Sequence, residues 1–162
     1  LLLRKDMRSA YSQPMKTMIR TFAWLKKQNR LVVMDQMSAE KGTFEFRAHL
    51  HLNNMRHDAS LKKLTEKSFH YVHPKAELRI QTNAPCTVSS GYTVSDRGSI
   101  WNEKLQQAEA DKGNAFVLSY GPAGKCASAA FFAVLGKNAA SVKESPEGVT
   151  VDGVLIPWYS GK

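Results

Sequence analysis

Hydrophobic and polar residues alternate along most of this chain, which is the pattern typical of β-strands with one buried face. The alternation is clearest in the expected strand Thr43–Leu52. Its apolar residues, beginning with Phe44, fall on one face, whereas His49 and His51 fall on the other, because side chains alternate across a sheet. Turn residues separate such runs at short intervals, so the chain reads as a series of short strands.

Nine segments are expected to form strands: Ile19–Leu25, Leu31–Asp35, Thr43–Leu52, Ser68–Val72, Ala76–Thr82, Ala115–Tyr120, Ser128–Leu135, Gly148–Val151 and Val154–Trp158. The segment 26–29, His73-Pro74-Lys75 and the pair Asp152-Gly153 are expected turns. Many strands with turns between them favour a sandwich or barrel over a parallel α/β sheet. We therefore predict an all-β, antiparallel β-sandwich of about nine or more strands, in one domain covering residues 1–162.

Two segments do not follow the strand pattern. Residues 53–63 are polar and are expected to form a loop, and Trp101–Lys112 is the one helix candidate. The apolar stripe of that segment is thin, so a short surface helix is expected there.

Composition narrows the function classes without selecting one. The 162 residues are 43% hydrophobic and 9% aromatic, as expected for a single globular domain. The formal net charge of +9 fits a polyanionic partner or surface, which could be nucleic acid, acidic glycan or anionic membrane, and it fits equally well a basic protein that is merely soluble. However, the lysines and arginines are dispersed, with no nucleic-acid-binding motif. No apolar run is long enough to span a membrane, and no glycine-rich phosphate loop occurs.

Few residues suggest chemistry by spacing alone. His49 and His51 lie two apart on one strand face, so both imidazoles can approach one ligand or metal ion, or both can simply face solvent. Asp35 closes an apolar run and is expected to cap a turn. Cys86 and Cys126 belong to no Cys-x-x-Cys pair, so one disulfide and two free thiols both remain open. No Gly-x-Ser-x-Gly element or Ser/His/Asp arrangement is present.

The chain begins Leu1-Leu2-Leu3, without an initiator Met and without the ordered regions of a signal peptide. We expect it to start partway through a longer protein.

Several short segments, in order, resemble the C-terminal β-domain of heparinase II/III-like polysaccharide lyases, which are also similar to alginate lyases. Lys5–Tyr11 is similar to the family's Gly-Asp-x-Thr-x-Ala-Tyr segment, with Lys5 and Arg8 in place of its Gly and Thr. Further similar segments are Arg20–Leu25, Leu31–Met37, Phe44–His51, Ala76–Thr82 and Phe131–Leu135. The resemblance covers most of the chain.

This resemblance implies a secreted or periplasmic lyase that cleaves acidic, uronic-acid-containing polysaccharide by β-elimination. The family's catalytic Tyr would lie on an upstream helical (α/α) toroid domain, and a further His would lie in a His-Asn-containing segment before this chain begins, so no catalytic residue is assigned here. The family's structural zinc site corresponds to Asp6 and His51, with His49 as the alternative if the register slips by two. Zinc is therefore expected in the full-length protein, and little is expected in this chain alone.

Two other functions remain open. One is a non-catalytic carbohydrate-binding or interaction domain, which would bind glycan tightly without an upstream domain. The other, weaker one is a basic nucleic-acid binder, which predicts a steep salt dependence without glycan selectivity.

Overall fold

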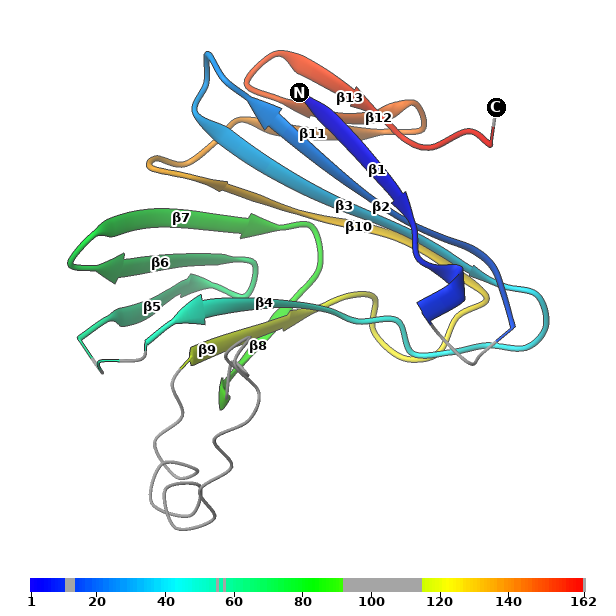
Figure 1. Cartoon of the computed structure of the whole chain (residues 1–162), viewed down its shortest axis with the longest axis horizontal. Helices are drawn as coiled ribbons and strands as arrows, with labels where there is room; N and C mark the ends of the chain where they lie inside the picture. The colour runs from blue at the N-terminus through cyan, green and yellow to red at the C-terminus, as the bar shows by residue number, and fades with distance from the viewer. Residues whose placement is uncertain (11–13, 55, 57, 92–114, 162) are drawn as a thin grey trace, which may run out of the picture.

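The structure is a computed structural model that describes residues 1–10, 14–54, 56, 58–91 and 115–161. Its largest element is a seven-stranded antiparallel sheet in the spatial order β1-β2-β3-β10-β7-β6-β5 (Figure 1). The strands are β1 (Leu2–Asp6), β2 (Met15–Leu25), β3 (Arg30–Ala39), β10 (Ser128–Gly136), β7 (Ala76–Thr82), β6 (Ser68–His73) and β5 (Ser60–Thr65). A short 3-10 helix, η1 (Arg8–Ala10), follows β1. The antiparallel all-β, sandwich-like fold expected from the sequence is confirmed.

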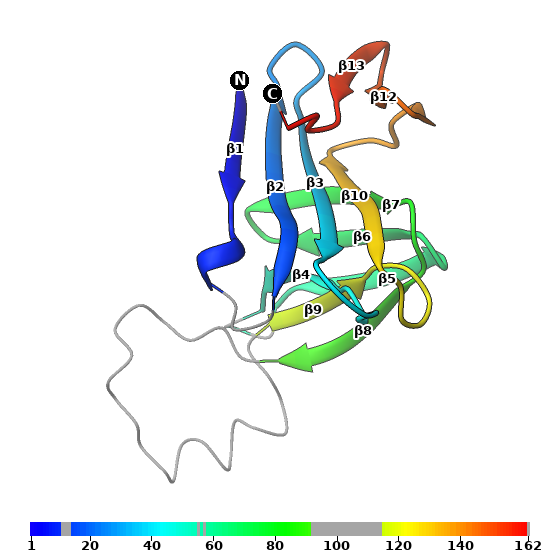
Figure 2. The ribbon, with the colours of Figure 1, turned by 90° about the vertical axis from the view of Figure 1, so that its right-hand side faces the viewer.

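Two three-stranded antiparallel sheets complete the described part of the chain. One has the order β4-β9-β8, and its strands are β4 (Ala48–Asn53), β9 (Ala115–Tyr120) and β8 (Cys86–Gly91). The other has the order β11-β12-β13, and its strands are β11 (Val142–Ser145), β12 (Gly148–Val151) and β13 (Val154–Pro157). In both ribbon views β12 and β13 lie away from β8 and β9 (Figures 1 and 2).

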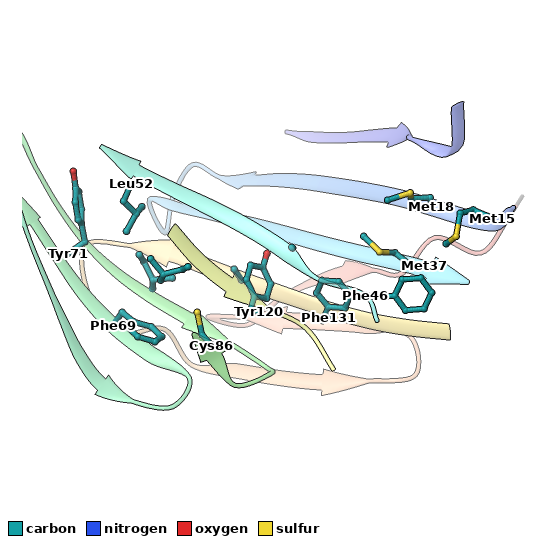
Figure 3. Packing of buried hydrophobic residues seen from close by; sticks show 14 residues of the cluster. Met15, Met18, Met37, Phe46, Leu52, Phe69, Tyr71, Cys86, Tyr120 and Phe131 are labelled. Carbon is teal, nitrogen blue, oxygen red and sulfur yellow. The ribbon is translucent and has the colours of Figure 1, made fainter. Parts of the chain in front are cut away.

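The two small sheets pack against opposite faces of the large sheet, because alternate residues of its strands point to opposite sides. The inner face, which we define as the one toward β4-β9-β8, contributes Met37, Phe131 and Ile80 to a buried cluster shared with Leu118 and Tyr120 (Figure 3). Each large apolar side chain buried in this way contributes about 1.5–3 kcal/mol.

The outer face packs against β11-β12-β13. Val32, Met34 and Val134, which alternate with the inner-face residues of β3 and β10, form a second buried cluster with Val149 and Ile156. The large sheet is therefore the middle layer of three, and both of its faces are apolar where a small sheet covers them.

Most of the expected strands are confirmed, with bounds that differ by a few residues. Ser68–His73 pairs with Ala76–Thr82 across the expected proline turn, and Val151 pairs with Val154 across Asp152-Gly153. Asp152 has a φ of 48° and Gly153 a φ of 83°, as a tight two-residue hairpin turn requires.

Two expectations were wrong. The expected strand Thr43–Leu52 is regular only from Ala48, and Phe44, four residues before β4, forms an isolated bridge with Cys126 instead of pairing within a sheet. The expected loop 53–63 contains the start of β5, which pairs with β6. Almost every β5 side chain is exposed, so this edge strand carries no alternation that the sequence could reveal.

Three further strands, β1, β8 and β11, were not expected from the sequence. All five β1 side chains are exposed, and β11 is short and mostly polar. The helix expected at Trp101–Lys112 lies outside the described residues. No helix of the described part is long and apolar enough to cross a membrane.

Candidate functional site

Three turns of the large sheet meet at one of its ends. Strand pairing places Gly136, the last residue of β10, opposite both Arg30 of β3 and Arg79 of β7. Because β2–β3 and β6–β7 are hairpins, the turn 26–29 and the turn between His73 and Ala76 lie at this same end. The segment that leaves β10 after Gly136 is the third connection. Side chains that are far apart in sequence are thus brought together at one end of the strands.

A groove of about 670 Å³ lies at this end, and we call it the Trp24 groove. Its lining residues are Trp24, Asn29, Leu31, Val72, His73, Pro74, Lys75, Ala76, Glu77, Leu78, Leu135, Gly136 and Lys137. Leu31 pairs directly with Trp24 on one side and with Leu135 on the other, so the three side chains share a face. Leu78 and Leu135 also pack against the inner-face cluster. The floor of the groove is therefore an apolar extension of the core.

One aromatic side chain and several cations border this floor. Trp24 is 40% exposed, which is high for so large an apolar ring. Lys75 and Lys137 line the groove and are exposed, and Lys26 and Lys27 are exposed in the adjoining β2–β3 turn. Within the described residues none of these four ammonium groups has a carboxylate within ion-pair distance. Their charge is therefore available to an anionic ligand.

The histidine in the groove is held by its neighbours. The His73 ring stacks on Tyr71, with 6.3 Å between centroids. Its Nδ1 accepts a 3.1 Å hydrogen bond from the Lys75 backbone N–H, and its Nε2 lies 3.7 Å from Asp58. These contacts fix the β6–β7 turn and hence the position of Lys75 beside the floor.

A buried ion pair lies further along the same face. Arg20 Nε and Nη2 donate to the two carboxylate oxygens of Asp35 at 2.7 and 3.1 Å, and Asp35 is 1% exposed. Burial raises the pKa of Asp35, although the Arg20 guanidinium opposes that shift. Asp35 lies in the middle of β3, so the expectation that it caps a turn was wrong. Its position in the core makes it a structural residue.

Two buried tyrosines lie near the ion pair and the groove, and neither is suited to proton abstraction. Tyr120 packs edge-on against Phe131, with 5.7 Å between ring centroids (Figure 3). Its hydroxyl has no hydrogen-bond partner among the described residues, and burial raises its pKa strongly. The Tyr71 hydroxyl donates a 2.6 Å hydrogen bond to the Asn53 carbonyl, and burial raises its pKa as well. A general base needs a lower pKa and access to the substrate.

The residues expected to bind zinc lie on different sheets. Asp6 ends β1 of the large sheet, where hydrogen bonds from Arg8 lower its pKa and Arg8 Nη2 lies 2.7 Å from Oδ2. His49 and His51 are exposed on β4 of a small sheet, on the face predicted from the alternation. Among the described residues no three His, Cys, Asp or Glu side chains gather as metal ligands. Zinc binding by Asp6 and His51 stays a prediction.

The two cysteines are free thiols, so the structure selects one of the two redox alternatives. Cys86 is buried, and burial raises its pKa to about 11. Since the thiolate is the reactive form, we expect Cys86 to resist Ellman's reagent at pH 8 while the half-buried Cys126 reacts. Quantified labelling with peptide mapping checks this. Cys126→Ser should abolish the fast phase, and rapid labelling of Cys86 in the folded protein would contradict the assignment.

The sequence did not indicate the groove. Trp24 was assigned only to a strand, and the lysines looked dispersed because they lie up to 111 positions apart, from Lys26 to Lys137. The local pattern contained one usable feature, which is that Lys26, Lys27 and Lys75 fall in hairpin turns. Which turns lie together depends on strand order, and no local pattern encodes that order.

Comparison with known proteins adds no assignment: no protein-family model matches the chain, and no curated protein matches it.

Proposed function

We propose that this domain binds an acidic polysaccharide in the Trp24 groove and forms one wall of the substrate cleft of a secreted or periplasmic polysaccharide lyase. The observation that carries the proposal is the combination of an exposed indole and unpaired lysines along one apolar floor. A sugar ring presents an apolar C–H face that packs on an aromatic ring, while lysine ammonium groups attract its carboxylates.

The resemblance to heparinase II/III-like lyases supplies the chemistry of this proposal. Such a lyase removes the C5 proton beside a uronate carboxylate, expels the oxygen at C4 and leaves a C4–C5 double bond. That reaction needs a base, an acid for the leaving oxygen and a group that neutralises the carboxylate. Lys75 and Lys137 are suited to attract the acidic chain, while the proton-transfer groups are assigned to the upstream helical domain. No step is assigned to a metal ion.

A second candidate is a carbohydrate-binding domain without a catalytic partner. It is favoured by one observation, which is that this chain itself supplies an exposed indole and two exposed lysines at one groove. A lyase assay that follows the ultraviolet absorbance of the new double bond separates the two functions. Activity on alginate, chondroitin sulfate or heparin in the longer protein, with none in this chain, supports the lyase. No activity in either, with glycan binding retained, supports the binding domain.

Replacing Trp24 with alanine is expected to weaken binding of an acidic polysaccharide about tenfold, which corresponds to about 1.4 kcal/mol. The reason is the loss of the stacking surface, and isothermal titration calorimetry measures it. Leu155→Ala is the matched control, because Leu155 is an exposed apolar residue of the β11-β12-β13 sheet. If the Trp24→Ala variant and the native chain bind the polysaccharide equally well, the Trp24 groove is not the binding site.

The double variant Lys75→Ala/Lys137→Ala is expected to bind about three- to tenfold more weakly, since each exposed ion pair contributes about 0.2–1 kcal/mol. The loss should shrink as salt rises, because these charges are solvent-exposed. Lys62→Ala/Lys67→Ala is the matched control: it removes the same charge from exposed positions in β5 and in the turn after it, and should bind like the native chain. Equal losses in both double variants would indicate binding by net charge alone.

A further inference from the structure

The cations around the Trp24 groove are arranged as a row rather than a cluster. The groove is lined from β2, β3, β10, β7 and β6, which are consecutive neighbours in the sheet. Trp24 lies on β2, Lys137 follows β10, and Lys75 lies in the turn between β6 and β7. Neighbouring strands are about 4.8 Å apart, so the five strands span about 19 Å from first to last.

The floor runs along this same direction. Leu31 and Leu135 are directly paired neighbours across β3 and β10. Leu78 lies on the same face of β7, two residues from Ile80, which is the direct partner of Leu135. A ligand that covers the floor and reaches both Trp24 and Lys75 must therefore cross the strands, close to their ends. One sugar ring cannot contact both groups, because two strands, β3 and β10, lie between β2 and the β6–β7 hairpin whose turn carries Lys75.

We infer that the Trp24 groove binds an extended acidic glycan that runs perpendicular to the strands, with one sugar stacked on Trp24 and successive acidic groups near Lys137 and Lys75. This inference rests on the proposed function and specifies the form of its ligand. The ligand is an internal stretch of several sugar units, and recognition does not require a chain end.

The positive charge suits both polyanions, and the kind of floor favours a glycan over single-stranded nucleic acid. Proteins that bind single strands stack successive bases on successive aromatic rings. Among the described lining residues only Trp24 and His73 carry aromatic rings, and the floor between them is aliphatic. An aliphatic floor suits the C–H faces of consecutive sugar rings, whereas flat bases would find a single exposed stacking surface at Trp24.

The test is a titration of the full chain with alginate and chondroitin sulfate oligomers, from disaccharide to decasaccharide, by isothermal titration calorimetry. We expect affinity to rise at least about tenfold with length until the groove is filled, and then to level off. Oligomers with a chemically reduced end should bind as well as unreduced ones. Lys75→Ala should weaken binding of the decasaccharide severalfold and leave the disaccharide unaffected, whereas Trp24→Ala should weaken both.

The remaining outcomes separate the inference from the function on which it rests. A disaccharide that binds as tightly as a decasaccharide, or a strict need for an unmodified end, overturns the inference and leaves glycan binding intact. If no oligomer binds and the chain is shown to be folded by a cooperative melting transition, the proposed function is overturned as well. Tighter binding of oligo-deoxythymidine than of any glycan overturns both in favour of a nucleic-acid site.

Discussion

Replacing Arg20 with methionine is expected to lower the free energy of unfolding by about 3–5 kcal/mol at neutral pH. The substitution removes the guanidinium that donates to both oxygens of Asp35 and leaves that carboxylate in a core position with 1% exposure. A buried charge without its partner has lost its hydration and gained nothing in return. Urea-induced unfolding followed by circular dichroism measures the loss.

The loss should depend on pH in a defined direction. Burial already raises the pKa of Asp35 in the folded protein, and the Arg20 guanidinium lowers it, so the variant should have a pKa that is higher still. Between the unfolded pKa of about 3.9 and this raised value the folded state binds more protons than the unfolded state. Stability of the variant should therefore increase as the pH falls toward 4, and its deficit should be largest at neutral pH.

The double variant Arg20→Met/Asp35→Leu is the matched control. Apolar replacement of a whole buried ion pair is often neutral or stabilising, so the double variant should recover most of the lost stability and lose the pH dependence described above. Equal stability of the single and double variants at neutral pH would show that an unpaired Asp35 is not the cause of the loss.

Replacing Gly136 with alanine is expected to destabilise the fold by about 2–4 kcal/mol. An added Cβ would overlap Nη1 of Arg30 and lie 2.6 Å from its Cδ. Arg30 cannot move aside freely, because its Nε donates to Asp152 at 3.0 Å and its other nitrogens donate to the carbonyls of Asn138 and Ala139. Differential scanning calorimetry measures the resulting drop in melting temperature.

Two comparisons test this explanation. In an Arg30→Met background the same Gly136→Ala change should cost less, since the shorter and unbonded methionine can yield, and the double-mutant cycle should show a clear coupling. Gly124→Ala is the matched control, because an added Cβ there meets nothing within 4 Å and only the positive φ of 72° opposes it. A smaller loss at Gly136 than at Gly124 would contradict the role of the overlap.

The sequence predicted the strands that bury one face and missed those that do not. β6, β7 and β12 were found because apolar side chains recur at every second position and turn residues follow them. β1 and β5 are edge strands whose side chains are almost all exposed, so no alternation marks them. Their backbone hydrogen bonds to a neighbouring strand hold them in place, and local sequence does not specify that neighbour.

The residues that the sequence singled out for chemistry show the same division between what one strand determines and what strand pairing determines. Alternation correctly placed His49 and His51 on the exposed face of β4, because that depends only on the geometry of one strand. It could not show that Asp35, at the end of an apolar run, lies inside the core opposite Arg20. That pairing depends on the register of two strands.

By itself the sequence determined the all-β class, the main hairpins and a surplus of positive charge, since these follow from residue types and short-range spacing. Tertiary structure alone decided that Trp24, Lys75 and Lys137 border one groove and that Cys86 is a buried thiol. The physical reason is that strand order brings together turns more than 100 residues apart, through backbone N–H and C=O groups that every residue except proline carries in full.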